Sequence, residues 1–282
     1  MIRHMANNKS ETPAALVAKL KDDLEALSIK AREANLSSIA RRNLDNGMRE
    51  IMEVLRDLLR DLDPIRQPEA VFDPSNPKVV GRFVSLALVA QKRYPLADVD
   101  RFYGSGVYAI YYKGDFAPYA PLSGTETPIY VGQAAPGLSN AREPIDQGEK
   151  LAKRLSEHRK NIQKATSTLD INDFEYRALV VQSGWETAAE DYLIHLFKPI
   201  WNSETKILYG LGKHGDDAKT RQNKRSPWDT LHPGRGWAAK SAEDARTEPQ
   251  IREDLDTHFN ATKIYSELDD VLHDFVLELR QA

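Results

Sequence analysis

Three short segments rich in Val, Ile, Tyr and Phe stand in the middle of this 282-residue chain, and they limit the folds open to it. The first two are "GVYAIYYKG" and "TPIYVGQA", and the third is "FEYRALVV", residues 174–181. Runs of this kind predict β-strands. The stretch between the first two is full of turn residues, so we expect an antiparallel hairpin with a long loop. Residues 115–127 would form the tip of that hairpin.

Two helical segments separate and follow these strands. The basic run "KLAKRLSEHRKNIQK", residues 150–164, lies between the second and third strands. After the third strand comes "WETAAEDYLIHLFKPIWN", which Pro199 should stop. The order strand, strand, helix, strand, helix predicts an α+β fold, with a small mixed or antiparallel three-stranded sheet flanked by helices.

The flanks of this core are helical in pattern. Residues 13–62 carry apolar side chains at three- and four-residue steps, which predicts two long amphipathic helices. These helices either pack on their own domain or form an oligomerisation arm. We therefore expect a helical arm and linker over 1–99, a core over 100–205, and a basic segment with C-terminal helices over 206–282.

The amino-acid composition excludes several kinds of functional site. The chain has no cysteine, which excludes disulfides, thiolate zinc sites and cysteine nucleophiles, so a metal would need oxygen or imidazole ligands. The pattern shows no apolar run long enough for a membrane span and no secretory signal, so we expect an intracellular, cytoplasmic protein. The net charge is −3, yet Lys and Arg gather in 150–164 and in 206–240. Two basic patches in an acidic background are more typical of a nuclease with a DNA-binding groove than of a protein that coats DNA non-specifically.

The first two strands carry two similar tripeptides, Gly106-Val107-Tyr108 and Tyr130-Val131-Gly132. Either tyrosine alone would be read as an ordinary strand residue. If the strands pair, Tyr108 and Tyr130 could meet on one sheet face, because cross-strand neighbours stand about 5 Å apart. The glycines would leave room for a ligand or backbone to approach.

The helices add four candidates. Arg154 and His158 lie four residues apart on one helix face, where they can present a guanidinium to a phosphate and an imidazole to a proton. Glu190 flanks an apolar stripe and is either a carboxylate paired with Lys or water, or a metal ligand. Asn202, just after "FKPIW", is either a capping residue or an amide donor to the same site.

This ordered set resembles the GIY-YIG nucleases. The two motif tyrosines, the motif helix, the metal-binding glutamate and the final asparagine of that family match Tyr108, Tyr130, Arg154 with His158, Glu190 and Asn202. The flanking stretches "FYGSGVYAIYYKGD" and "SPWDTLHPGRGWA" look similar to its type II restriction endonucleases, including those cutting CCGCGG. Two features depart from the pattern. The gap between the tripeptides is long, and Gln133 stands where relatives often have lysine.

The resemblance implies a Mg²⁺-dependent type II site-specific deoxyribonuclease that hydrolyses double-stranded DNA at a short palindromic, GC-rich site. Glu190 would hold the Mg²⁺, and core 100–205 would be the catalytic domain. A palindrome implies a homodimer or a tetramer, because one site cuts each strand. A restriction enzyme also implies a cognate DNA methyltransferase and a bacterial cytoplasm.

Base recognition is expected in the basic 206–240 segment. Arg221, Arg225 and Arg235 are candidates for guanine edges, with surface solvation as the alternative for each. Two other functions share the same residues. One is a structure-specific or repair nuclease, and the other is a non-catalytic protein that uses the same fold only to bind DNA.

Overall fold

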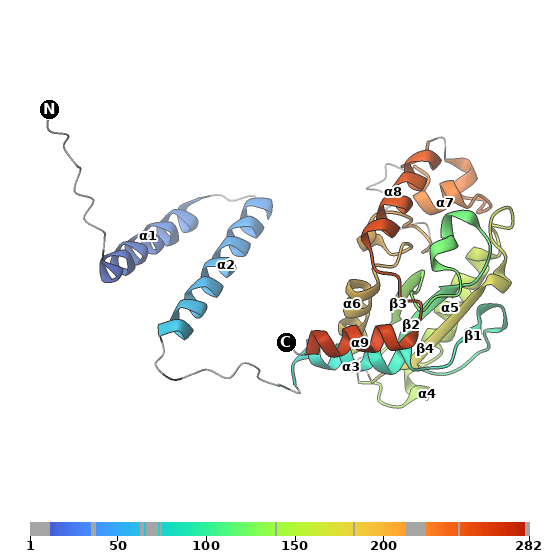
Figure 1. Ribbon diagram of the computed structural model, residues 1–282, viewed down its shortest axis with the longest axis horizontal. Coiled ribbons are helices and arrows are strands. Elements are labelled where there is room, and N and C mark those ends of the chain that lie inside the picture. Colours follow the sequence, from blue (N-terminus) through green and yellow to red (C-terminus); the bar gives the residue numbers. More distant parts are fainter. Residues whose placement is uncertain are drawn as a thin grey trace. The chain divides into compact units, whose positions relative to one another are not determined.

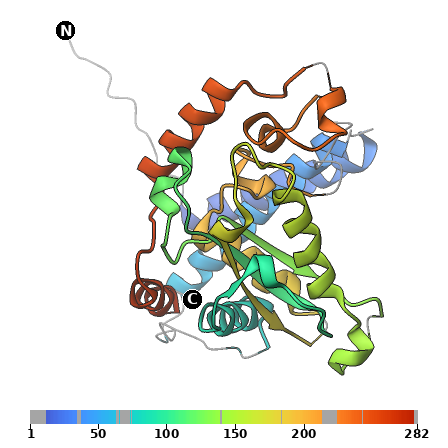
Figure 2. The same cartoon turned by 90° about the vertical axis from the view of Figure 1, so that its right-hand side faces the viewer.

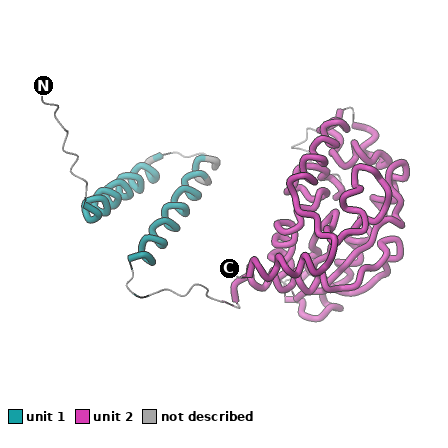
Figure 3. The backbone as a smooth tube through the Cα atoms, viewed as in Figure 1, with its two compact units in different colours: residues 1–69 teal, residues 70–282 magenta. Residues whose placement is uncertain are grey.

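The structure is a computed structural model that describes residues 12–34, 38–62, 65, 73, 75–138, 140–182, 184–212, 224–241 and 243–279. The chain divides into two compact units, residues 1–69 and residues 70–282 (Figure 3). Each unit is described by itself below.

The first unit contains the two predicted long helices, α1 (Pro13–Glu33) and α2 (Ser38–Leu62) (Figure 1). Thr12 caps α1, because its side chain accepts a hydrogen bond from the Ala15 amide at 3.3 Å. α2 leaves a row of large apolar side chains exposed, up to 69% for Leu59 and 70% for Leu62. Within the described part of this unit, the apolar face of α2 is therefore not buried.

The second unit is built on a four-stranded antiparallel sheet of order β1-β4-β2-β3. Its strands are β1 (Tyr94–Pro95), β2 (Gly106–Tyr112), β3 (Tyr130–Ala134) and β4 (Phe174–Val180). The three predicted strands are confirmed, and β1 is an addition. With two residues it is too short to leave a period in the sequence. β3 is an outer strand of this sheet, a position that matters for the site.

The face of β2 that carries Tyr108, Ile110 and Tyr112 is covered by three helices (Figure 2). These are α5 (Lys150–Ile162), α7 (Pro227–Leu231) and α8 (Glu248–Ala261). The opposite face, with Val107 and Tyr111, packs against α3 (Pro77–Val89), α6 (Glu186–Phe197) and α9 (Leu268–Leu279). A short helix, α4 (Pro144–Gln147), and five 3₁₀ turns complete the unit: Leu96–Asp98, Ala117–Leu122, Ile171–Asp173, Ser203–Thr205 and Ala238–Lys240.

Helix α3 belongs to this second unit, where Gly81 lets it approach α6 closely. A Cβ at Gly81 would lie 2.7 Å from the Ala188 carbonyl carbon. The compact units thus divide at residue 69, and α3 packs with residues that follow it in the sequence. The assignment of separate roles to 1–99, 100–205 and 206–282 stays a prediction.

The hairpin loop between β2 and β3, which includes the expected tip over 115–127, is packed against the rest of the unit. Tyr119 is fully buried, and its hydroxyl accepts a hydrogen bond from the Trp201 indole at 2.9 Å. Glu126 forms ion pairs with Arg93 at 2.9 Å and with Arg177 at 2.6 Å.

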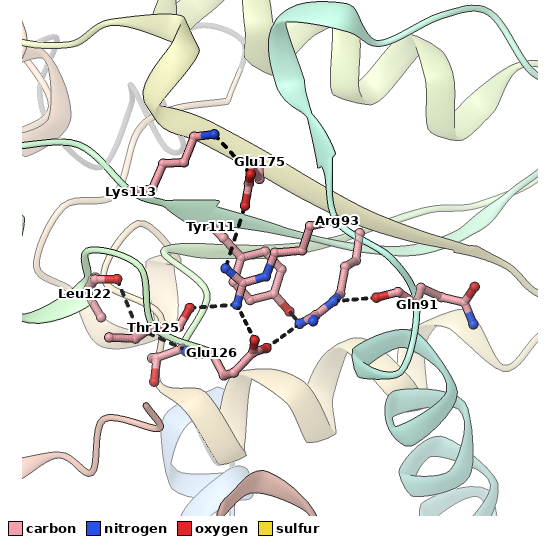
Figure 4. A network of polar contacts seen from close by, with 10 residues as sticks. Gln91, Arg93, Tyr111, Lys113, Leu122, Thr125, Glu126 and Glu175 are labelled. Carbon is pink, nitrogen blue, oxygen red and sulfur yellow. Dashed lines mark hydrogen bonds and ion pairs between the residues drawn. The ribbon is translucent and has the colours of Figure 1, made fainter. Parts of the chain in front are cut away.

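Around Tyr111 the two arginines and Glu126 form one polar network (Figure 4). The Arg93 and Arg177 guanidinium carbons stand 4.0 and 4.9 Å from the Tyr111 ring centre. Burial works against a charge on Glu126, but the two arginines hold the pKa of that carboxyl below its usual value. The network fastens the end of the loop to the sheet.

The segment expected to be a polar DNA-contacting region also contributes to the core. Leu208, Leu211, Trp228 and Leu231 are buried in the same cluster as Tyr108. Residues 213–223 lie outside the described residues. The part of 206–240 that the structure describes therefore supports the sheet, in addition to any role on the surface.

Candidate active site

Tyr108 and Tyr130 lie on one face of the sheet, as diagonal neighbours across β2 and β3. Tyr108 pairs with Gly132, Ile110 pairs with Tyr130, and the two tyrosine ring centres are 6.1 Å apart. Gly132 makes this arrangement possible, because a Cβ there would lie only 2.6 Å from Tyr108 Cζ. The Tyr108 side chain therefore lies over the backbone of the outer strand, with its hydroxyl at the edge of the sheet.

Helix α5 brings His158 and Arg154 to the same place. Leu151, Leu155 and Ile162 are buried beneath α5 and fix its orientation. His158 is 1% exposed, and its Nε2 lies 2.7 Å from the Tyr108 hydroxyl oxygen. Its ring centre is 4.8 Å from that of Tyr130. One turn earlier, Arg154 forms a 3.1 Å ion pair with Glu157 and interacts electrostatically with both tyrosines.

The environment changes the acid–base behaviour of this cluster. Burial, with a smaller effect of the Arg154 charge, lowers the pKa of His158 to about 3. Burial and the neighbouring Tyr130 raise the pKa of Tyr108 well above its usual value. The sequence alone predicts an ordinary histidine pKa near 6.5 for His158, and the buried site does not have it. Both groups are uncharged at pH 7 in the free protein.

The contact between Tyr108 and His158 can form in two ways. Either a neutral Tyr108 donates its hydroxyl hydrogen to Nε2 and Nδ1 carries the imidazole hydrogen, or Nε2–H donates to the hydroxyl oxygen and Nδ1 is an acceptor. Nδ1 is buried and has no hydrogen-bond partner among the described residues. In both forms an unsatisfied polar atom is buried beside the tyrosines, which is rare in proteins.

Glu190 approaches the outer strand from the other side of the sheet, on α6. Burial is the main cause that raises the pKa of its carboxyl to about 7; hydrogen bonds from Gln133 oppose this increase, and the nearby Glu204 and Asp191 contribute to it. Gln133 lies on β3, next to Gly132, so Glu190 and Tyr108 meet the same strand from opposite faces. The sequence marked Gln133 only as a departure from a common lysine and missed its contact with Glu190.

Glu190 fits a divalent cation bound mainly by the substrate. No cluster of three or more His, Asp or Glu side chains occurs among the residues that the structure describes. Mg²⁺ does not need one, since it is often held by one or two carboxylates together with phosphate oxygens and waters. A half-buried carboxylate with a raised pKa gains most from such a partner, because the cation favours its charged form.

Asn202 supports the outer strand rather than the substrate. Its amide oxygen accepts a hydrogen bond from the Val131 amide at 3.0 Å, and its amide nitrogen donates to the Val131 carbonyl at 2.9 Å. The side chain is 5% exposed. Asn202 therefore fixes the backbone next to Tyr130.

The three arginines expected to read bases differ in their surroundings. Arg221 lies outside the described residues. Arg225 is one-third exposed and pairs with Asp244 at 2.6 Å. Arg235 is 2% exposed, and all five of its N–H groups are used, by Asp229 and by the carbonyls of Gly210, Leu211 and Gly212. Arg235 has no donor left for a guanine, so we withdraw it as a base-reading residue.

A cavity of about 320 Å³ opens beside Arg154 and His158. Lys160, Lys164 and Trp237 also line it. None of these three was singled out from the sequence. The basic run over 150–164 was the available signal for the lysines, whereas nothing in the sequence places Trp237 near α5.

The family profile for the Eco29kI GIY-YIG domain matches residues 100–259, more than half of the chain. The chain belongs to this family of GIY-YIG restriction endonucleases. It is therefore a nuclease with DNA as its partner, and GIY-YIG nucleases generally use a divalent metal. No curated protein matches its sequence. None of the helices that the structure describes is both long and apolar enough to cross a membrane.

Gly132 offers a test of the Tyr108 position. Gly132→Ala should displace the tyrosine hydroxyl and slow DNA cleavage about 100-fold, since a shift near 1 Å costs that much in an oriented site. The expected loss of stability is about 1–3 kcal/mol. Single-turnover cleavage and urea unfolding measure the two effects. Gly124→Ala is a poor control because Gly124 has a φ of +74°, whereas Gly236 has open space around it. Gly236→Ala should therefore cut normally, and a fully active Gly132→Ala variant would refute the assigned position.

Proposed function

We propose that this nuclease is a Mg²⁺-dependent type II restriction enzyme, which hydrolyses phosphodiester bonds of double-stranded DNA at a short palindromic, GC-rich site. The observation that carries the chemistry is the 2.7 Å contact between the Tyr108 hydroxyl and His158 Nε2, next to Arg154 and Tyr130. The family match supports the restriction class. Eco29kI, which names that family, cuts CCGCGG, and this supports a GC-rich site here.

The proton of the attacking water is the main chemical problem. A free phenolate at pH 7 would cost roughly 4 kcal/mol even at the reference tyrosine pKa, and the buried Tyr108 would cost more. Tyr108 can avoid this charge if its hydroxyl hydrogen moves to His158 Nε2 as its oxygen takes the proton from water. The imidazolium that results is unfavourable in the free protein, where burial and the Arg154 charge lower the pKa of His158 to about 3. The proton relay that we assign to Tyr108 and His158 therefore depends on the negative charge of the bound phosphate to stabilise the imidazolium.

The remaining roles follow from position. Arg154 stabilises the phosphoryl oxygens in the transition state, and Tyr130 orients the water or the phosphate. Glu190 would hold a Mg²⁺, whose charge offsets the charge that develops on the scissile phosphate and the departing 3′ oxygen. Asn202 keeps β3 in register with these groups. Arg225 and Arg221 stay proposals for base recognition.

A palindromic site calls for two copies of the active site, so we propose a homodimer or tetramer. The exposed apolar face of α2 supports contact through the first unit. A cognate methyltransferase that protects the same sequence, in a bacterial cytoplasm, completes this proposal.

Deleting residues 1–69 should convert the oligomer into a monomer. The reason is that the apolar stripe of α2, which includes Leu58, Leu59 and Leu62, is lost with it. Sedimentation equilibrium of the full chain and of the shortened chain measures the mass. In the full chain, Leu59→Asp should weaken the oligomer, whereas Glu50→Ala on the same helix should not. An unchanged mass after the deletion would rule out this contact.

Cleavage of a plasmid of known sequence in the presence of Mg²⁺, followed by sequencing of the ends, tests the proposed function. A restriction enzyme gives discrete fragments that share one terminal sequence. Cleavage confined to flaps or junctions would instead establish a structure-specific nuclease. Binding without cleavage would favour a DNA-binding protein.

A further inference from the structure

The cavity beside the proposed active site has a cationic wall. Lys160 and Lys164 contribute two ammonium groups, and neither forms an ion pair within the described part of the chain. The carboxylate at the rim, Glu157, is already paired with Arg154 at 3.1 Å. The cavity therefore has an excess of positive charge that is not neutralised from within the protein.

The part of the cavity wall formed by residues 234–237 is held against the end of α5. Gly234, with a φ of +145°, lets the backbone approach closely, because a Cβ there would lie 2.7 Å from the Lys164 carbonyl carbon. Asn161 donates a hydrogen bond to the Leu211 carbonyl at 3.0 Å. The cavity is therefore formed before any ligand arrives.

Trp237 is held in this wall by the buried Arg235. The guanidinium carbon of Arg235 lies 5.0 Å from the Trp237 ring centre. Arg235 is itself fixed by its ion pair with Asp229 and by three backbone carbonyls. A fixed, partly exposed indole in the same cavity as two unpaired lysines combines an apolar surface with positive charge, which suits a nucleotide.

The spacing between Arg154 and Lys160 along α5 can be compared with the spacing of nucleotides along a DNA strand. Lys160 is six residues beyond Arg154, which is about 9 Å along a helix axis. Successive nucleotides of one DNA strand rise about 3.4 Å, so this spacing corresponds to about two or three nucleotides. A strand whose phosphate contacts Arg154 can therefore place a nearby phosphate beside Lys160 and Lys164.

We propose that this cavity is a second phosphate subsite, in which Lys160 and Lys164 bind a backbone phosphate within about three nucleotides of the cut. Trp237 packs against the sugar or base next to that phosphate. The subsite rests on the proposed nuclease function and extends it, since it sets the position of the strand relative to Tyr108. Lys160, Lys164 and Trp237 are positioning residues.

The test neutralises one phosphate at a time. Duplexes carry a single methylphosphonate at each of the first three phosphates on either side of the mapped cut. With the natural protein, one position should lower single-turnover cleavage and duplex affinity about tenfold, since one charge-assisted contact is lost. The double variant Lys160→Gln/Lys164→Gln should cut unmodified DNA about tenfold more slowly and lose the sensitivity at that position.

The matched control is Lys153→Gln, an exposed lysine of the same helix that does not line the cavity. It should keep the sensitivity to the methylphosphonate. The double variant should also reduce the slope of log affinity against log salt concentration by about one, because the two lysines share one phosphate.

Two results would overturn the subsite. One is a natural protein that cuts DNA but shows no sensitive position. The other is a double variant in which each methylphosphonate lowers cleavage by the same factor as it does in the natural protein. If the natural protein cuts no DNA, the proposed function fails instead. The salt dependence of duplex binding by the natural protein and by the double variant, measured by fluorescence anisotropy, would then still test the phosphate contact.

Discussion

Glu190→Gln is expected to slow DNA cleavage about a thousandfold while leaving the fold intact. Glutamine keeps the shape of the side chain and removes the charge that would hold a divalent metal. Single-turnover cleavage at saturating Mg²⁺ measures the loss. Because burial raises the pKa of Glu190 to about 7, the proton competes with the metal near neutral pH. In the natural protein, the apparent Mg²⁺ affinity should therefore rise as the pH increases through 7.

Asp191→Asn is the control for this prediction. Asp191 neighbours Glu190 and raises the pKa of its carboxyl, so its loss should shift the pH dependence of Mg²⁺ affinity downward. Cleavage at high pH and saturating Mg²⁺ should stay close to that of the natural protein. A Glu190→Gln variant that cuts at the natural rate would remove Glu190 from the metal site.

Tyr108→Phe and His158→Ala should each slow cleavage by about 10²- to 10⁴-fold, the usual range for general acid–base groups. In a relay both residues move one proton, so the double variant should be hardly slower than either single one. Tyr112→Phe provides the matched control. Tyr112 lies on the same strand and the same face, and its hydroxyl accepts a hydrogen bond from the Phe116 amide at 2.7 Å. Its loss should change stability more than rate.

One result would contradict the proton relay between Tyr108 and His158. If His158→Ala cuts almost normally while Tyr108→Phe is inactive, the proton takes another route. The pH profile adds a second check. Burial lowers the pKa of His158 to about 3, so His158 should not titrate between pH 5 and 8 in the free protein. A change of kcat/KM near pH 7 would then not come from His158, and Glu190, whose pKa is raised to about 7, is the group expected to cause it.

The sheet and its helices could be predicted from sequence because each long element leaves a local period. The packing of the hairpin loop could not, because it depends on contacts with distant residues. Tyr119 is buried by Trp201, which is 82 positions away, and Glu126 is held by Arg93 and Arg177. Turn residues in the loop indicated only that it was irregular.

The active site, like the fold, could be predicted from the sequence only in part. The meeting of Tyr108 with Tyr130 follows from strand pairing, and the common face of Arg154 and His158 follows from helical spacing. The burial of Arg235 does not follow from its setting in "HPGRG", because its partners are Asp229 and three carbonyls of an earlier segment. The low pKa of His158 could not be predicted from the sequence either, since it comes mainly from the residues that bury it.

Asn202 has a consequence for association between molecules. An outer strand offers free amide and carbonyl groups to any other extended chain, and this leads to aggregation unless something blocks it. The Asn202 side chain bonds to both the amide and the carbonyl of Val131, in the way that the backbone of a fifth strand would. A single side chain thus caps the edge at Val131 against strand addition. Because the cap is one side chain, it protects the edge at Val131 without adding a fifth strand next to the active-site residues of β3.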